Sequence, residues 1–262
     1  MDAIDGNPLR RLFRETASRL RDGGVPFWLE YGTLLGLVRE GSLISWDQDI
    51  DLGLWRHDVT DDALADVFSD SPLAAHKHPE SDCFHVRRKG SQAPCFIDLN
   101  LYTKRSGVAV AVQSFSKLNG RQRLMVLLCD SLAGKEHDPH WNPVVNRAQR
   151  GLYLFLKHLA APMLPEGLRQ RIARYPARAH DRSKAYAVYE FPSRLFEDLA
   201  EIELFGSPVK IPKDTVEYLE RAYGKDWRIP RRWKHWSEGA TYITDRDPRQ
   251  GDPRRRSAGG PR

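Results

Sequence analysis

Three aspartates occupy alternate positions in the segment WDQDIDL, residues 46–52. Side chains of a strand alternate between its two faces, so Asp47, Asp49 and Asp51 would project from one face. Same-face neighbours lie roughly 7 Å apart, which lets their carboxylates converge on cations of the Mg²⁺ type, held about 3.5 to 4 Å apart in two-metal sites. An isolated Asp-x-Asp pattern more often marks a solvated acidic turn or edge strand, so this motif needs support from elsewhere.

A fourth aspartate supplies that support, because Asp98 stands in the apolar segment CFIDLNLY, residues 95–102. Burying a carboxylate in an apolar strand costs free energy unless a cation is bound to it or paired with it. Oxygen ligands suit hard divalent ions such as Mg²⁺ or Mn²⁺. The predicted metal ligands are the aspartates of these two segments: Asp47, Asp49, Asp51 and Asp98.

Upstream of the aspartates, Gly32-Thr33 follows the apolar run of residues 25–31 and precedes a helical pattern. At such a strand-to-helix turn, backbone N–H groups and a hydroxyl can approach a phosphate closely. The combination of Gly-Thr, Asp-x-Asp and a lone downstream Asp therefore predicts a site for a metal-bound phosphate ester.

Residues 31–53 have the sequence YGTLLGLVREGSLISWDQDIDLG. It resembles the signature of the LicD family, which includes bacterial phosphocholine transferases and is similar to fukutin and fukutin-related protein. Looser matches follow in YEFP (189–192), VKIP (209–212) and YGKDW (223–227), whereas residues 105–185 show little resemblance. Ser45 also departs from the family pattern, because many members have Pro there.

The resemblance implies a nucleotidyltransferase-type fold and a metal-dependent transferase. Such an enzyme moves a phospho-alcohol, for example phosphocholine, phosphoribitol or phosphoglycerol, from a CDP-alcohol donor to a saccharide acceptor of a cell-surface glycan. It implies that Asp49, Asp51 and Asp98 are catalytic. Metal ions on the first two would neutralise the diphosphate, and Asp98 would be both ligand and general base. Asp47 would orient a metal-bound water.

Gly32, Thr33 and Arg39 of the matched motif are the predicted phosphate-binding residues. The guanidinium of Arg39 could form a fork on the phosphates, and a structural salt bridge is an equal alternative. Thr33 could instead be only a helix cap, although its place in the motif favours a phosphate contact.

Two other functions stay open. The first is a nucleotidyltransferase that adds NMP from an NTP to a small molecule. The second is a non-catalytic interaction protein, or a nucleic-acid binder that uses the arginine-rich C-terminal end. A structural zinc site is not expected, because the spacing of the candidate ligands fits no familiar zinc pattern. Those candidates are His76, His78, Cys83, His85 and Cys95.

The elements that must position these residues alternate along the first half of the chain. Helical periodicity covers 9–20 and 34–39, with a shorter helix at 61–68. Extended patterns cover 25–31, 42–55, 83–88, 95–102 and 108–115. The fold class predicted for this half is α/β (α+β), a mixed sheet flanked by helices.

Helical patterns dominate after residue 120, at 121–132 and 145–159, and a capping-box sequence at Asp214 begins another helix that Gly224 ends. The basic side of the 145–159 helix leaves open a peripheral membrane association, although core packing is the commoner cause of such a pattern. Three parts are predicted: a catalytic core at 1–120, a mainly helical part that completes the substrate site at 121–245, and a disordered basic tail at 246–262.

Composition limits the remaining possibilities. The chain has 262 residues, 40% of them hydrophobic, and its first twenty residues lack the pattern of a signal peptide. We therefore expect a cytoplasmic protein, which could lie at the inner face of the membrane. The formal net charge of +6 lies mostly in residues 246–262. Because the basic character is mainly that of a tail, no specific nucleic-acid partner is expected.

Overall fold

The structure is a computed structural model that describes residues 7–78, 80–91, 95–134, 147–230 and 236–249. These residues divide into two compact units. The first consists of Met1–Ser114, Tyr186–Thr244 and Pro248–Arg262, and the second of Phe115–Ala185 with Asp245–Asp247. Of the predicted tail at 246–262, the structure describes residues 246–249, and residues 250–262 lie outside the described residues.

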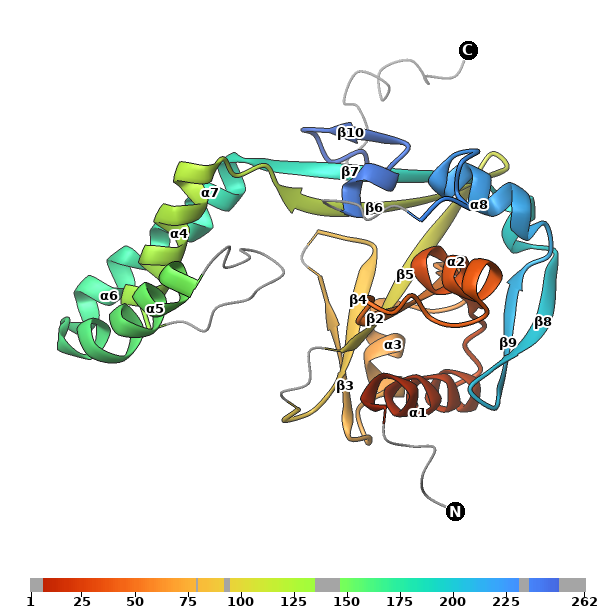
Figure 1. Ribbon diagram of the computed structural model, residues 1–262, viewed down its shortest axis with the longest axis horizontal. Helices are drawn as coiled ribbons and strands as arrows, with labels where there is room; N and C mark the ends of the chain where they lie inside the picture. Colours follow the sequence, from red (N-terminus) through yellow and green to blue (C-terminus); the bar gives the residue numbers. More distant parts are fainter. Residues whose placement is uncertain (1–6, 79, 92–94, 135–146, 231–235, 250–262) are drawn as a thin grey trace, which may run out of the picture. The chain divides into compact units, whose positions relative to one another are not determined.

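The first unit is built on a mixed sheet whose main path has the order β10-β7-β6-β5-β2-β1-β9-β8; β4 also pairs with β5, and β3 pairs with β4 (Figure 1). At its centre, β2 (Asp49–Trp55) and β5 (Phe96–Arg105) run parallel. The short β1 (Trp28–Leu29) is antiparallel to β2 and parallel to β9 (Ser207–Pro212). The other strands are β3 (Leu73–Lys77), β4 (Cys83–Arg88), β6 (Val108–Ser116), β7 (Lys184–Pro192), β8 (Leu199–Leu204) and β10 (Tyr242–Thr244).

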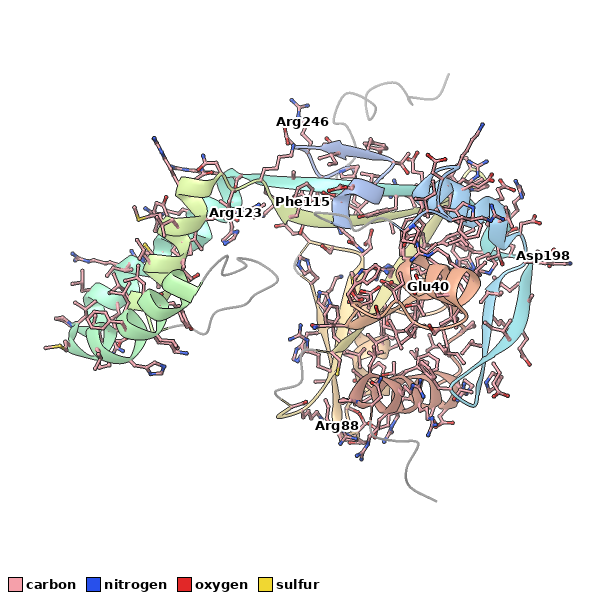
Figure 2. All side chains as sticks on the ribbon, viewed as in Figure 1. Glu40, Arg88, Phe115, Arg123, Asp198 and Arg246 are labelled. Carbon is pink, nitrogen blue, oxygen red and sulfur yellow. The ribbon has the colours of Figure 1, made fainter. Side chains whose placement is uncertain are left out.

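Helices of this unit follow the local sequence signals. In α1 (Pro8–Asp22), the Asn7 side chain accepts a hydrogen bond from the Leu9 N–H at 2.9 Å, and one face of the helix is buried. Arg88, labelled in Figure 2, pairs with Glu15 of this helix and so links it to β4. The remaining elements are α2 (Tyr31–Glu40), α3 (Asp61–Val67), α8 (Thr215–Tyr223) and the 3-10 turns η3 (Ser193–Phe196) and η4 (Trp236–Gly239).

The second unit contains the last residues of β6 and the first residues of β7, and its other described elements are helical. It contains α4 (Gly120–Leu132), α5 (Arg147–Phe155), α6 (Glu166–Ile172) and α7 (Arg174–Arg182), with a π-helical turn η1 (Leu156–Ala160) and a 3-10 turn η2 (Ala161–Met163). A capping box between Asn119 and Gln122 begins α4. Residues 145–146 of the predicted 145–159 helix lie outside the described part.

The fold class is confirmed as a mixed α/β sheet flanked by helices, but the secondary structure differs from the prediction after residue 183. Residues 184–212 form β7, β8 and β9 instead of helix, and β7 and β9 join the sheet of the first unit. The sequence KAYAVYEFP of β7 is apolar and aromatic on both faces, as a strand covered on both sides requires. The predicted helical part is therefore continuous only to Arg182, and α8 is the α-helix that follows it in the described residues.

Three smaller predictions were also wrong. The extended segment begins only at Asp49, because residues 45–46 form a turn, and the strand before Tyr31 is two residues long. The helix predicted after Asp214 and ended by Gly224 is present as α8, but the Asp214 side chain makes no capping hydrogen bond and its Oδ2 lies 3.6 Å from Arg194 Nη1 instead. No helix in the described ranges is long and apolar enough to cross a membrane.

Candidate active site

The register of the central strands brings the predicted carboxylates together. Asp51 of β2 lies directly opposite Asp98 of β5, and Asp49 lies two residues earlier on the same face. One carboxylate oxygen from each of Asp49, Asp51 and Asp98 can be chosen so that all three lie within 4.8 Å of one another. The three residues named from the sequence thus form one cluster, contributed by two neighbouring strands.

Burial and like charge both act on this cluster. Burial raises the pKa of Asp49 well above its usual value, and the charges of Asp51, Asp47 and Asp98 raise it further. Burial likewise raises the pKa of Asp51, with the charge of Asp98 as the next cause and a backbone hydrogen bond from Gly32 opposing the shift. A bound divalent cation would favour the ionised forms, so the electrostatics of the cluster fit a metal site.

Asp47 reaches the cluster by a different route from the one predicted. It precedes β2 in a turn, where its N–H donates to the Ile44 carbonyl at 3.0 Å, so strand alternation does not place it. Its carboxylate is nevertheless close enough to that of Asp49 to raise the pKa of Asp49. A Cβ added to Gly32 would lie 2.6 Å from Asp47 Oδ2 and 3.6 Å from Asp51 Oδ2. A side chain at this position would therefore have to displace the Asp47 carboxylate, whereas Asp51 lies at ordinary contact distance.

Thr33 joins the first turn of α2 to β2. Its Oγ1 accepts a hydrogen bond from the Asp51 N–H at 2.9 Å, and the residue is 2% exposed. The side chain therefore holds the backbone of Asp51 rather than capping its own helix, whose N-cap position is Glu30. Contact of Thr33 with a phosphate stays a prediction.

Arg39 lies in the last turn of α2, where its Nε donates to Glu40 Oε1 at 3.1 Å. Glu40 is labelled in Figure 2 at the end of this helix. The structure thus shows the ion pair that the sequence left as an alternative. A contact between Arg39 and phosphate also stays a prediction.

A buried glutamate beneath the cluster was missed by the sequence analysis. Glu30 is 0% exposed, and its Oε1 accepts a hydrogen bond of 2.9 Å from Asn100 Nδ2, whose Oδ1 accepts one of 2.8 Å from Gln113 Nε2. Burial raises the pKa of Glu30 to about 8, and hydrogen bonds to Asn100, Tyr102 and Trp28 oppose this shift. The available signal was a charged residue that ends the apolar run VPFWLE.

Tyrosines fix the turn that carries Gly32. Tyr31 has a positive φ of 40°, and its N–H donates to the Tyr218 hydroxyl at 2.9 Å, which stabilises this strained backbone. The hydroxyls of Tyr31 and Tyr102 lie 2.9 Å apart. The strand-to-helix turn is therefore held by side chains from β5 and α8, both of which lie far downstream of it in the sequence.

The strand beside β5 adds two residues that were expected to be incidental. His85 Nδ1 lies 2.6 Å from Asp98 Oδ1, and Cys83 lies on the same face of β4. Ligand atoms of Cys83, His85 and Asp98 all lie within 4.8 Å of one another. None of the chain's cysteines, all of which are described, is in a disulfide.

Residues 24–124, which contain the whole carboxylate cluster, match the family model described as "LicD/FKTN/FKRP, nucleotidyltransferase domain". This segment is a LicD-family domain. The resemblance seen in the sequence is confirmed at this level. The domain covers β1, α2, β2 and β5, so it supplies Asp49, Asp51 and Asp98 and the turn that supports them.

Named relatives of the LicD-family domain differ in how much of their length is shared. Ribitol 5-phosphate transferase FKRP of Homo sapiens is 34% identical over 106 residues, which are 38% of this chain and 21% of FKRP. Ribitol-5-phosphate transferase FKTN of Mus musculus is 26% identical over 89% of this chain and 36% of its own. Lipopolysaccharide cholinephosphotransferase LicD of Haemophilus influenzae is 22% identical over 79% of this chain and 83% of its own. The chain thus spans about a third or less of FKRP and FKTN.

Proposed function

We propose that this protein is a metal-dependent transferase that moves a phospho-alcohol from a CDP-alcohol donor to a hydroxyl of a cell-surface glycan. The observation that carries the proposal is the convergence of Asp49, Asp51 and Asp98 within a LicD-family domain. The names of the relatives support the same reaction class, because they are transferases of ribitol phosphate and of cholinephosphate.

The residues of the site fit a hard divalent cation. The three convergent carboxylates offer only oxygen donors, and all three are half-buried. Because Gly32 has no side chain, the carboxylate of Asp47 can also lie close to this cluster. We propose that Asp49, Asp51 and Asp98 hold Mg²⁺ or Mn²⁺. When bound, the cation would neutralise negative charge on the donor diphosphate and on the departing CMP.

Asp98 and His85 have separate roles in the proposed transfer step. In the proposed transfer, the acceptor oxygen forms a bond to the β-phosphorus of the donor while the bond from that phosphorus to the CMP oxygen breaks. Asp98 accepts the proton of the acceptor hydroxyl. Hydrogen bonding to His85 holds one oxygen of Asp98, which orients the carboxylate for this role.

The proposal is tested by titrating CDP-choline, CDP-ribitol and CDP-glycerol into the protein with Mn²⁺ and by measuring CMP release with a glycan acceptor. We expect metal-dependent binding of a CDP-alcohol that the Asp49→Asn, Asp51→Asn double variant loses. Asp62→Asn is the matched control, because Asp62 is an exposed aspartate of α3 outside the cluster.

Other outcomes separate the alternatives. Consumption of an NTP with release of pyrophosphate would replace the proposed reaction by nucleotidyl transfer to a small molecule. Equal behaviour of wild type and the double variant would show that the carboxylates are not the site. A cytoplasmic location, at the inner face of the membrane, is also proposed, and cell fractionation tests it.

A further inference from the structure

The carboxylate cluster continues onto the neighbouring strand β4 with ligands of a different chemical class. In the antiparallel pair of β4 and β5, His85 lies opposite Asp98 and Cys83 lies opposite Asn100. Cys83 and His85 are two residues apart, so both side chains lie on the face that carries Asp98. One thiol, one imidazole and one carboxylate therefore meet on this face.

The separations within this group suit a single small ion. The ligand atoms of Cys83, His85 and Asp98 all lie within 4.8 Å of one another. Donors around a tetrahedral zinc ion, at about 2.0 to 2.3 Å from the metal, are roughly 3.3 to 3.8 Å apart. The group can thus reach a coordination geometry by shifts of about 1 Å, which rotation of side chains can supply. The fourth position would be open to water.

The thiol of Cys83 is buried and has only a weak hydrogen-bond contact among the described residues. The residue is 4% exposed, and its Sγ–H has only a long contact of 3.7 Å to the Phe84 carbonyl. His85 is better held, since it packs edge-on against Phe96 at 5.3 Å between ring centroids and bonds to Asp98. A preorganised imidazole beside a buried thiol is a common pair of zinc ligands.

The two halves of the extended cluster prefer different ions. Thiolate and imidazole select soft or borderline ions such as Zn²⁺, whereas carboxylates alone suit Mg²⁺ and Mn²⁺. Asp98 is a member of both groups. If the Asp98 carboxylate binds Zn²⁺ together with Cys83 and His85, it is no longer available to the ion held by Asp49 and Asp51, or to the acceptor hydroxyl.

We propose that Cys83, His85 and Asp98 form a second metal site, selective for Zn²⁺, whose occupation inhibits the transferase by engaging Asp98. Binding converts the Cys83 thiol to a thiolate, with its proton released to solvent. The inhibition rests on the proposed function above, whereas zinc binding does not.

Cobalt replacement tests the site without any substrate. Co²⁺ bound to a thiolate gives an intense near-ultraviolet charge-transfer band, so wild type titrated with Co²⁺ should show this band. Cys83→Ser should lose it, and Cys95→Ser, the matched control at the residue before β5, should keep it. His85→Asn should also weaken Co²⁺ binding. A wild-type band that survives in Cys83→Ser, or no band in wild type, would overturn the site.

Zinc inhibition tests the consequence. The assay uses saturating Mn²⁺ and a CDP-alcohol that turns over. In Cys83→Ser, the Zn²⁺ concentration that gives half-inhibition should rise by about tenfold or more, because even the loss of a residue that only hydrogen-bonds to a metal ligand weakens metal binding by this much. Equal inhibition of Cys83→Ser and wild type would overturn the regulatory part. A thiolate band without any CDP-alcohol turnover would contradict the proposed function but would still support the zinc site. Thermal melts would establish that each variant is folded.

Discussion

At the scale of single residues, the active-site region concentrates acidic groups in a place where ionisation is unfavourable. Asp49, Asp51 and Glu30 all have raised pKa values, and burial is the largest cause for each. A folded state that holds protons more tightly than the unfolded chain is stabilised at low pH and loses that advantage as the pH rises. The metal-free protein should therefore become less stable towards neutral pH.

Glu30→Gln tests this linkage at one position. The folded pKa of Glu30 is about 8, against a usual value of 4.5. The stability difference between pH 5 and pH 8 should therefore be smaller in the variant, by on the order of a few kcal/mol. Denaturant unfolding in chelator at the two pH values measures it. Glu220→Gln, an exposed residue of α8, should behave as wild type, and an unchanged pH slope in Glu30→Gln would count against the buried acid.

Gly32→Ala tests the close approach of the carboxylates. The new Cβ would lie 2.6 Å from Asp47 Oδ2, so Asp47 must move. We expect Mn²⁺ affinity to fall by roughly tenfold or more, with stability changed by less than about 1 kcal/mol because alanine favours a helix. Calorimetry measures the affinity. Gly120→Ala, where a Cβ meets nothing within 4 Å, is the control, and equal affinities would show that Asp47 does not contribute.

At the scale of elements, the site depends on the contact between the first turn of α2 and the strand β2. The Thr33 hydroxyl of α2 accepts the N–H of Asp51 in β2, and Tyr218 of α8 holds the N–H that begins α2. The neighbouring strand β1 can pair with β2 because Gly53 leaves room for the Trp28 ring, which a Cβ at that position would approach to 2.3 Å. These contacts fix the positions of Asp51 and Gly32 relative to each other.

Thr33→Val removes the acceptor and keeps the side-chain shape. Because it leaves a buried N–H of Asp51 unsatisfied, we expect a loss of about 1 to 3 kcal/mol in unfolding free energy. CMP release should fall as well, since Asp51 loses its support. Thr33→Ser, which retains the hydroxyl, should recover most of both quantities. Equal unfolding free energies and equal rates of CMP release in Thr33→Val and Thr33→Ser would show that this hydrogen bond does not position Asp51.

At the scale of the whole molecule, the arginine-rich C-terminal end divides into two parts. Arg249 donates to the Glu80 carbonyl at 2.6 Å and lies 3.4 Å from Asp82 Oδ1, so this part belongs to the first unit. Residues 251–262 contain four arginines and one aspartate and lie outside the described residues. A truncation that tests the tail should therefore begin after residue 250.

Removal of residues 251–262 should leave metal-dependent donor binding unchanged and reduce binding to anionic vesicles, because it removes a net charge of +3. Co-sedimentation with phosphatidylserine vesicles at low and high salt measures the effect, and phosphatidylcholine vesicles are the control. Equal sedimentation of full-length and truncated chains would rule out a membrane role for this tail.

The sequence by itself determined the residues of the carboxylate cluster and the family of the domain that carries them. Asp-x-Asp spacing and the isolated Asp98 are local features, and so is the Gly-Thr turn, which is why they could be recognised without coordinates. The α/β character of the first half followed from the same local periodicity.

Only the tertiary structure decided which other groups surround those carboxylates. Glu30 meets Asn100 and Tyr31 meets Tyr218 across 70 and 187 residues of chain, and His85 faces Asp98 through strand register. The return of β7 and β9 to the sheet was missed for the same reason. Spacing along a chain sets which face a side chain occupies, but pairing between distant segments depends on the free energy of the whole packed sheet.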